Sequence, residues 1–177
     1  MNNKDHVRDC CDCHTIESRE VCTKRCSNSR LQPVQRWDQR FLELAKHVAT
    51  WSKDPSTQTG AVIVRPDRTV AGLGYNGFPR GCDDTPELYA DREKKYARIV
   101  HCEMNAILSA REPLHGYTLY TWPFISCDRC AAHVVQSGIN RAVAPILPEH
   151  LQKRWAVSVA TTRALYAEAG IRCEEIA

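Results

Sequence analysis

The sequence reads His101-Cys102-Glu103 at one point and Cys127-Asp128-Arg129-Cys130 a little further along. One imidazole and two thiolates are ligands that zinc prefers, and zinc binds four partners in a tetrahedron. Catalytic zinc sites leave the fourth position to water. Glu103 follows the histidine by two residues, and a carboxylate there can move a proton to or from such a water. We therefore predict a catalytic zinc held by His101, Cys127 and Cys130, with Glu103 as the catalytic acid and base.

A structural zinc site is the alternative, and it would require a fourth protein ligand. Cys102 is the nearest candidate by sequence. Because it directly follows His101, its side chain is expected to point to another side of the helix. We predict that Cys102 is a small buried residue.

Both ligand groups lie where the chain enters a helix. Cys127 and Cys130 are spaced i and i+3, so their thiols project from one side of a first helical turn. The positive end of a helix dipole favours thiolate over thiol. His101 begins a neighbouring helix, and two such βα units place their helix starts together at the carboxyl ends of the strands.

Hydrophobic periodicity and turn residues predict the rest of the fold. A helix runs from about Trp37 to Trp51, and a hairpin of strands over 61–64 and 69–75 follows. Residues 78–98 form a charged insertion with a short helix near 86–90. Helices are expected over 101–110, 127–136 and 148–169, and strands over 116–122, 141–144 and 171–173. This order predicts an α/β fold, a three-layer α-β-α sandwich with a mixed five-stranded sheet and helices on both faces.

The first 34 residues differ from the remainder. They are polar, lack periodicity and hold five of the ten cysteines. We predict a Cys-rich extension over 1–34 and a catalytic domain over 35–177. The extension is either flexible or the site of a second zinc, with Cys10, Cys13, Cys22 and Cys26 as candidate ligands.

The net charge and the hydropathy of the sequence limit the cellular locations and the binding partners that we expect for this protein. The net charge of +3 argues against a protein that coats nucleic acid. The sequence has no apolar run near the ~20 residues that span a bilayer, and its N-terminus is polar rather than a secretory signal. We expect a cytoplasmic protein whose cysteines are thiols or metal ligands.

Several segments together resemble the deoxycytidylate (dCMP) deaminases of the cytidine deaminase-like superfamily. The similarity runs from about Trp37 to Cys173 and is carried by Ser52–Val64, Gly74–Gly77, His101–Ile107 and Cys127–Ala131. The paired zinc motifs mark the superfamily, whereas the Ser-Lys-Asp-Pro-Ser loop and the Gly-Tyr-Asn-Gly turn mark the dCMP branch. The resemblance implies hydrolysis of dCMP to dUMP and ammonia, which supplies thymidylate synthesis.

The resemblance also implies roles for individual residues. Asn76 matches the residue that contacts the deoxyribose, and Lys95 lies where a basic residue contacts the phosphate. Ser52, Lys53 and Ser56 belong to a loop near the nucleotide. The loop after the fourth strand, which holds His150, Lys153 and Arg154, is a second phosphate candidate. For each basic residue the alternative is an ordinary solvated surface charge.

Many members of this family are homohexamers that dCTP activates and dTTP inhibits. The resemblance places effectors, with Mg²⁺ as their counterion, at Gly74, Tyr75, Asn76 and Gly77. This chain departs from the family at two places. Cys102 replaces an alanine, and Ile125-Ser126 replaces Phe-Pro before the first zinc cysteine, so that Ile125 or Phe124 must cover the base.

Two other functions remain open at this stage. One is deamination of a different substrate, such as dCTP, a modified dCMP or adenosine in tRNA. The other is a zinc or nucleotide sensor without catalysis.

Overall fold

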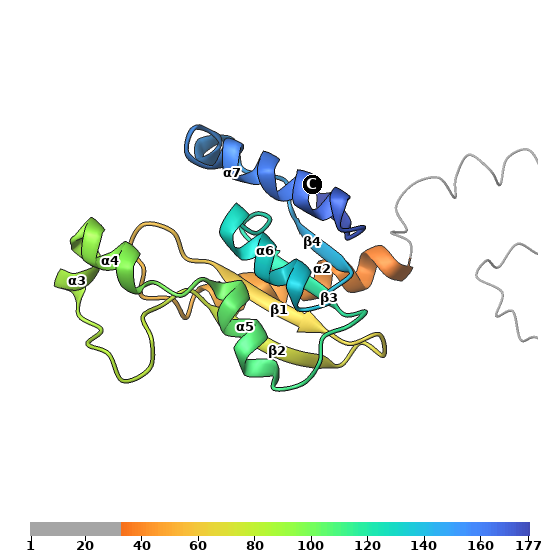
Figure 1. Cartoon of the computed structure of the whole chain (residues 1–177), viewed down its shortest axis with the longest axis horizontal. Coiled ribbons are helices and arrows are strands. Elements are labelled where there is room, and N and C mark those ends of the chain that lie inside the picture. The colour runs from red at the N-terminus through yellow and green to blue at the C-terminus, as the bar shows by residue number, and fades with distance from the viewer. Residues whose placement is uncertain (1–32) are drawn as a thin grey trace, which may run out of the picture. The chain divides into compact units, whose positions relative to one another are not determined.

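The computed structural model describes residues 33–177 (Figure 1). The elements follow in the order α2 (Pro33–Ala49), β1 (Gly60–Val64), β2 (Val70–Tyr75), α3 (Pro86–Ala90), α4 (Arg92–Arg98), α5 (Cys102–Ala110), β3 (Thr118–Trp122), α6 (Asp128–Gln136), β4 (Arg141–Pro145), α7 (Glu149–Glu168) and β5 (Arg172–Ile176). Each predicted helix and strand is confirmed to within a few residues. The sequence did not predict α4. Its start is stabilised by Asp91, whose carboxylate accepts a hydrogen bond from the Lys94 backbone N–H.

The five strands form one mixed sheet in the order β2-β1-β3-β4-β5. Strand β1 pairs antiparallel with both β2 and β3, whereas β3, β4 and β5 are mutually parallel. Each crossover after the hairpin therefore advances across the sheet in the same direction. Right-handed crossovers of this kind place α5, α6 and α7 on one face, and α2 covers the other. The predicted three-layer arrangement is confirmed.

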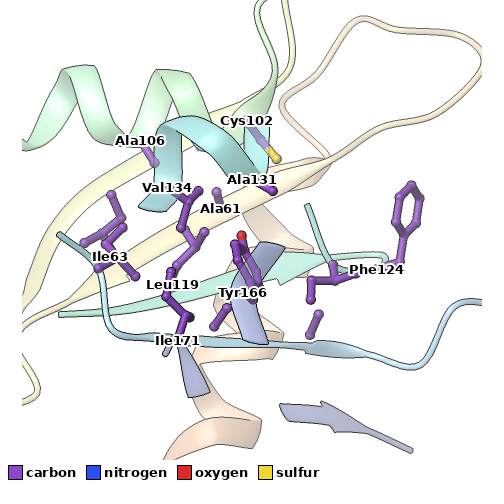
Figure 2. Close-up of a cluster of buried hydrophobic side chains, with 14 of the residues drawn as sticks. Ala61, Ile63, Cys102, Ala106, Leu119, Phe124, Ala131, Val134, Tyr166 and Ile171 are labelled. Atoms are coloured by element: carbon purple, nitrogen blue, oxygen red, sulfur yellow. The ribbon is translucent and has the colours of Figure 1, made fainter. Parts of the chain in front are cut away.

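The alternating residues of the central strands supply both cores. On β1, Ala61 and Ile63 face the core formed with α5, α6 and α7, while Val62 and Val64 face the core formed with α2. The larger core appears in Figure 2, where Ala106 of α5, Val134 of α6 and Tyr166 of α7 lie over the sheet. Because β1 is buried on both faces, the helices that hold the site are fixed to a rigid platform.

A buried charge network joins α2 to the other end of the sheet. The Arg141 guanidinium contacts both oxygens of Asp38 at 2.7 and 2.8 Å, and the Tyr120 hydroxyl donates to Asp38 Oδ1 at 2.6 Å. Burial disfavours the charge on Asp38, but these hydrogen bonds outweigh it and lower the pKa of its carboxyl. Arg141 also binds Glu174 of β5, so a single guanidinium links α2, β4 and β5.

None of the helices in the described part of the chain has the length and apolarity needed to cross a bilayer. The second zinc site predicted with Cys10, Cys13, Cys22 and Cys26 lies outside the described residues.

Candidate metal centre and adjoining pocket

Three side chains that suit zinc converge at the starts of two neighbouring helices. Within residues 33–177, His101, Cys127 and Cys130 form a group whose ligand atoms all lie within 4.8 Å of one another. His101 Nδ1 is 3.4 Å from each of the two Sγ atoms. Tetrahedral zinc with ordinary Zn–N and Zn–S bonds separates such atoms by roughly 3.5 Å. The donor types and these two distances therefore fit zinc.

Local structure explains why these side chains are available. His101 is the N-cap residue of α5 and Cys127 that of α6, and neither side chain makes a capping hydrogen bond. The first helical bonds are instead made by the backbone, with the His101 and Cys127 carbonyls accepting from Asn105 and Ala131. The imidazole and the thiol are thus left free at the positive ends of two helix dipoles.

Electrostatics favour a thiolate in this cluster. The hydrogen bond from Cys130 is the main cause that lowers the pKa of the Cys127 thiol to about 4, and contact with His101 lowers it further against the opposing effect of burial. The hydrogen bond with Cys127, together with burial, raises the pKa of the Cys130 thiol, which keeps its proton as the donor of that bond. Zinc requires thiolates and displaces their protons when it binds, and the contacts with Cys130 and His101 favour the thiolate form of Cys127.

Glu103 is buried beside the cluster and is 5% exposed. It lies in the first turn of α5, and the Cys102 thiol is 3.3 Å from Glu103 Oε2, where it can donate a hydrogen bond. Cys102 is itself 2% exposed and packs in the larger core, as Figure 2 shows. Cys102 is thus a small buried residue and is not among the clustered metal donors.

A pocket opens directly onto this cluster. His101, Glu103 and Cys127 form part of its lining. Aromatic and aliphatic side chains form another part, contributed by Trp122, Phe124, Ile125 and Trp155. The Phe124 and Trp155 rings pack with centroids 5.2 Å apart. Such walls suit a flat heterocyclic ring.

A polar network forms the remaining lining. Asp54 Oδ1 accepts hydrogen bonds from Lys95 Nζ at 2.6 Å and from the Ser56 hydroxyl at 2.8 Å. Asn76 donates through Nδ2 to Asp54 Oδ2 at 3.2 Å and accepts through Oδ1 from the Thr59 N–H at 2.8 Å. Asp54, Asn76 and Lys95 are all buried. The loop after α2 is therefore fixed in place around the pocket.

The sequence matches a known family over most of these elements. Residues 35–145 match the family described as the cytidine and deoxycytidylate deaminase zinc-binding region. This chain belongs to that family.

The matches to individual relatives extend over different shares of this chain and of each relative. An Aliivibrio fischeri protein named "Uncharacterized deaminase in luxG 3'region" is 38% identical over 138 residues, which cover 78% of this chain and 92% of that protein. A probable deoxycytidylate deaminase of Caenorhabditis elegans is 44% identical over 108 residues, 58% of this chain and 54% of its own. The human deoxycytidylate deaminase is 36% identical over 115 residues, 60% of this chain and 63% of its own. This chain thus matches little more than half of those two deoxycytidylate deaminases.

A solved structure supports the fold. The dCMP deaminase of cyanophage S-TIM5 in apo form superposes with a TM-score of 0.63 at 16% identity, covering 82% of this chain and all of that chain. At this identity the likeness establishes the cytidine deaminase-like architecture.

The structure brings most of the predicted site residues of the deaminase to one pocket. Ser56, Asn76 and Lys95 line it together with His101, Cys127 and Glu103. Ser52 lies just behind it, and its hydroxyl donates to the Asn76 carbonyl at 2.7 Å. Lys53 is not among the lining residues, and its ammonium is exposed and paired with Asp84 at 2.7 Å.

The segment with His150, Lys153 and Arg154 belongs to helix α7 and not to a loop. Of these three residues, only Arg154 is among those that line the pocket. Sequence reasoning missed seven further lining residues, Asp54, Thr57, Thr59, Tyr96, Ile99, Trp122 and Trp155. Trp122 ends strand β3 five residues before Cys127, which was a usable signal. Only the family resemblance indicated that the segment now seen as the start of α7 reaches this pocket.

The Gly-Tyr-Asn-Gly turn lies between two concavities. Asn76 lines the metal pocket, whereas Gly74, Tyr75 and Gly77 line a second one with Arg80. Gly74 has a packing reason to be glycine, because a Cβ there would lie 2.2 Å from the Cys102 carbonyl oxygen in α5. This close approach joins β2 to the start of the helix that carries Glu103.

Proposed function

We propose that this chain catalyses the zinc-dependent hydrolysis of dCMP to dUMP and ammonia. The observation that carries the proposal is the placement of a buried carboxylate, Glu103, in the same pocket as a three-donor zinc cluster. Three protein donors leave one tetrahedral position for water, which is the pattern of a catalytic zinc. Deoxycytidylate deaminases among the relatives, including the human protein, support dCMP as the substrate.

His101, Cys127 and Cys130 would hold the metal. When bound, zinc supplies a Lewis acid that lowers the pKa of water to about 7, so that hydroxide is available at neutral pH. Glu103 accepts the proton that the water loses and gives it to N3 of the cytosine ring. Oxygen bonds to C4, and Glu103 then takes the second proton from this C4 hydroxyl and gives it to the amino nitrogen. The bond from C4 to that nitrogen breaks, so ammonia leaves and the C4 carbonyl of dUMP remains.

The remaining lining residues bind and orient the nucleotide. Phe124, Ile125 and Trp155 enclose the flat base and exclude water from it. Asn76 faces the sugar, and its amide is held in a fixed orientation by Thr59 and Asp54. Binding groups whose rotamers are already fixed lose little entropy when the substrate arrives.

The decisive experiment replaces one oxygen of the carboxylate with nitrogen. Glu103→Gln keeps the size of the side chain but removes its ability to accept the proton, so we expect at least a 100-fold loss of dCMP turnover, in the range of general acid–base catalysis. Zinc content, measured by atomic absorption, should stay at the wild-type level because Glu103 is not a ligand. Glu112→Gln, on a partly exposed carboxylate paired with Arg65, is the matched control.

Two results would contradict the proposal. Turnover of dCMP by Glu103→Gln at the wild-type rate would remove this carboxylate from the reaction. Preferred deamination of dCTP, of hydroxymethyl-dCMP or of adenosine in RNA by the wild-type protein would assign the site to a different substrate.

We further propose that the protein functions in cytoplasmic pyrimidine metabolism as a homo-oligomer, hexameric by family resemblance. The concavity lined by Gly74, Tyr75 and Gly77 is the proposed site for dCTP and dTTP with Mg²⁺. We also propose a second zinc in the Cys-rich extension, held by Cys10, Cys13, Cys22 and Cys26. Opposite changes in the KM for dCMP on adding dCTP or dTTP would support the effector site, and no change with either nucleotide would contradict it.

A further inference from the structure

The carboxylate of Glu103 needs a fixed orientation, because a proton moves only between atoms within hydrogen-bond distance. A glutamate side chain has three torsions, and it gives up much rotamer freedom when it is held in one position. The last of these torsions turns the two carboxylate oxygens, and its range is broad. A hydrogen-bond donor that binds one of the oxygens would fix this torsion before the substrate arrives.

The side chain of Cys102 supplies such a donor. Its Sγ lies 3.3 Å from Glu103 Oε2, and both residues are buried. A thiol that is buried among apolar side chains keeps its proton. It can therefore donate its S–H to the carboxylate, and the charge of the acceptor strengthens what is otherwise a weak bond. Within the described residues, no other side chain makes a hydrogen bond to this carboxylate.

The position of the Cys102 thiol is itself fixed by packing. Cys102 is part of the larger core, together with Ala61 of β1 and Ala106 of α5 (Figure 2). Its backbone is held as well, because strand β2 approaches so closely that a Cβ on Gly74 would lie 2.2 Å from the Cys102 carbonyl oxygen. The thiol cannot follow a moving carboxylate, so the carboxylate takes the orientation that the thiol selects.

This contact is a feature of this chain. The family resemblance places alanine where this sequence has Cys102, and the methyl group of alanine donates no hydrogen bond. Cys102 and Glu103 both line the pocket that holds the metal donors. The additional donor therefore lies beside the one carboxylate on which the proposed proton transfers depend.

We infer that Cys102 is a positioning residue whose thiol holds Glu103 Oε2, so that Oε1 is turned toward the reacting atoms. The inference rests on the proposed function, since it concerns the carboxylate used in that reaction. Cys102 takes no proton in the reaction and acts only through Glu103. Its effect belongs in kcat and not in KM, because the orientation of the carboxylate serves the proton transfers and not the binding of the nucleotide.

The experiment measures steady-state deamination of dCMP by the full chain for the wild type, Cys102→Ala, Cys102→Ser and Cys173→Ala. Cys102→Ala should lower kcat by about 3- to 10-fold, as for the loss of one hydrogen bond, and should leave the KM for dCMP unchanged. Cys102→Ser should return kcat to near the wild-type value, because a hydroxyl can donate to the same oxygen.

Cys173→Ala is the matched control. Cys173 is a partly buried cysteine of β5 that packs against the same core, so this variant also removes a sulfur atom, but at a position away from Glu103. Its kcat should equal that of the wild type. Zinc content by atomic absorption and the midpoint of urea unfolding are measured for each variant. If Cys102 were merely structural, kcat would follow the unfolding midpoint and would not depend on whether residue 102 carries a donor.

Four results would overturn the inference while leaving the proposed function in place. They are a wild-type kcat in Cys102→Ala, a loss in Cys102→Ala that appears in KM alone, a kcat in Cys102→Ser as low as in Cys102→Ala, and an equal loss in Cys173→Ala. A wild-type protein that does not deaminate dCMP would overturn the proposed function, and this inference with it. Cys102→Ala is expected to fold, because alanine favours helix and is the residue that the family resemblance places there.

Discussion

Replacing Lys95 with methionine tests whether this lysine holds the pocket together or serves only to bind substrate. Methionine keeps most of the apolar length of lysine but removes the ammonium, which leaves the Asp54 carboxylate buried without its partner. The two side chains are 9% and 5% exposed and meet at 2.6 Å. Removing one member of a buried pair costs about 3–5 kcal/mol.

The cost should lie at the lower end of that range. Asp54 keeps hydrogen bonds from the Ser56 N–H and hydroxyl at 2.8 Å and from the Asn76 amide at 3.2 Å. Burial raises the pKa of the Asp54 carboxyl, but the hydrogen bonds from Lys95 and from the Ser56 N–H and hydroxyl outweigh burial, so the pKa is lowered. A loss of about 3 kcal/mol lowers the melting temperature by roughly 6–12 °C in a chain of this size.

Urea unfolding of the full chain, followed by circular dichroism, measures this loss directly. Lys53→Met is the matched control, because Lys53 pairs with Asp84 at a similar distance but with 66% and 36% of the two side chains exposed. An exposed pair of this kind contributes under about 1 kcal/mol. The double variant Lys95→Met with Asp54→Asn should regain part of the stability, since it leaves no unpaired charge.

The reasoning is refuted if Lys95→Met loses no more stability than Lys53→Met. A change confined to the KM for dCMP, with an unchanged unfolding midpoint, would instead show that Lys95 contacts the phosphate. That outcome would favour the role first predicted from the sequence.

Two further predictions concern the core. Tyr120→Phe should destabilise the protein by about 1.5–3 kcal/mol, because it removes a hydrogen bond to the charged Asp38. Tyr166→Phe should be neutral or slightly stabilising, because the Tyr166 hydroxyl is buried with no partner within residues 33–177. Equal losses of stability for the two variants in urea unfolding would contradict this prediction. Because the pKa of Asp38 is lower in the folded state, its contribution is fully present above the unfolded value of about 3.9 and is lost as the pH falls below that value toward the folded pKa. Acid titration of the unfolding midpoint should therefore be shallower for Asp38→Asn, and a curve parallel to the wild type would contradict the role of the Asp38–Arg141 pair.

The cluster of metal donors could be predicted from local sequence because its geometry is local. The i and i+3 spacing of Cys127 and Cys130 fixes their relation within one helical turn. His101 and Cys127 are both helix N-caps, as expected from where each helical pattern begins. Strands β2 and β3 both run antiparallel to β1 and therefore point in the same direction. Chain that leaves their carboxyl ends starts from one edge of the sheet, and α5 and α6 begin there.

The binding part of the site could not be predicted in the same way. Lys53 and Lys95 are equivalent candidates in sequence, yet one is exposed beside Asp84 and the other is buried on Asp54. Which carboxylate a lysine meets depends on chain segments far apart in sequence. The same is true of Trp155 and Arg154, which reach the pocket only because α7 packs over the larger core.

The sequence by itself therefore determined the order of the elements, the layers and the zinc-binding chemistry, because hydrophobic periodicity and ligand spacing are local properties. Only the tertiary structure decided which charges are neutralised and which remain available to a substrate. That difference has a physical cause, since the charge a ligand meets depends on burial and on distances of a few ångströms between distant segments.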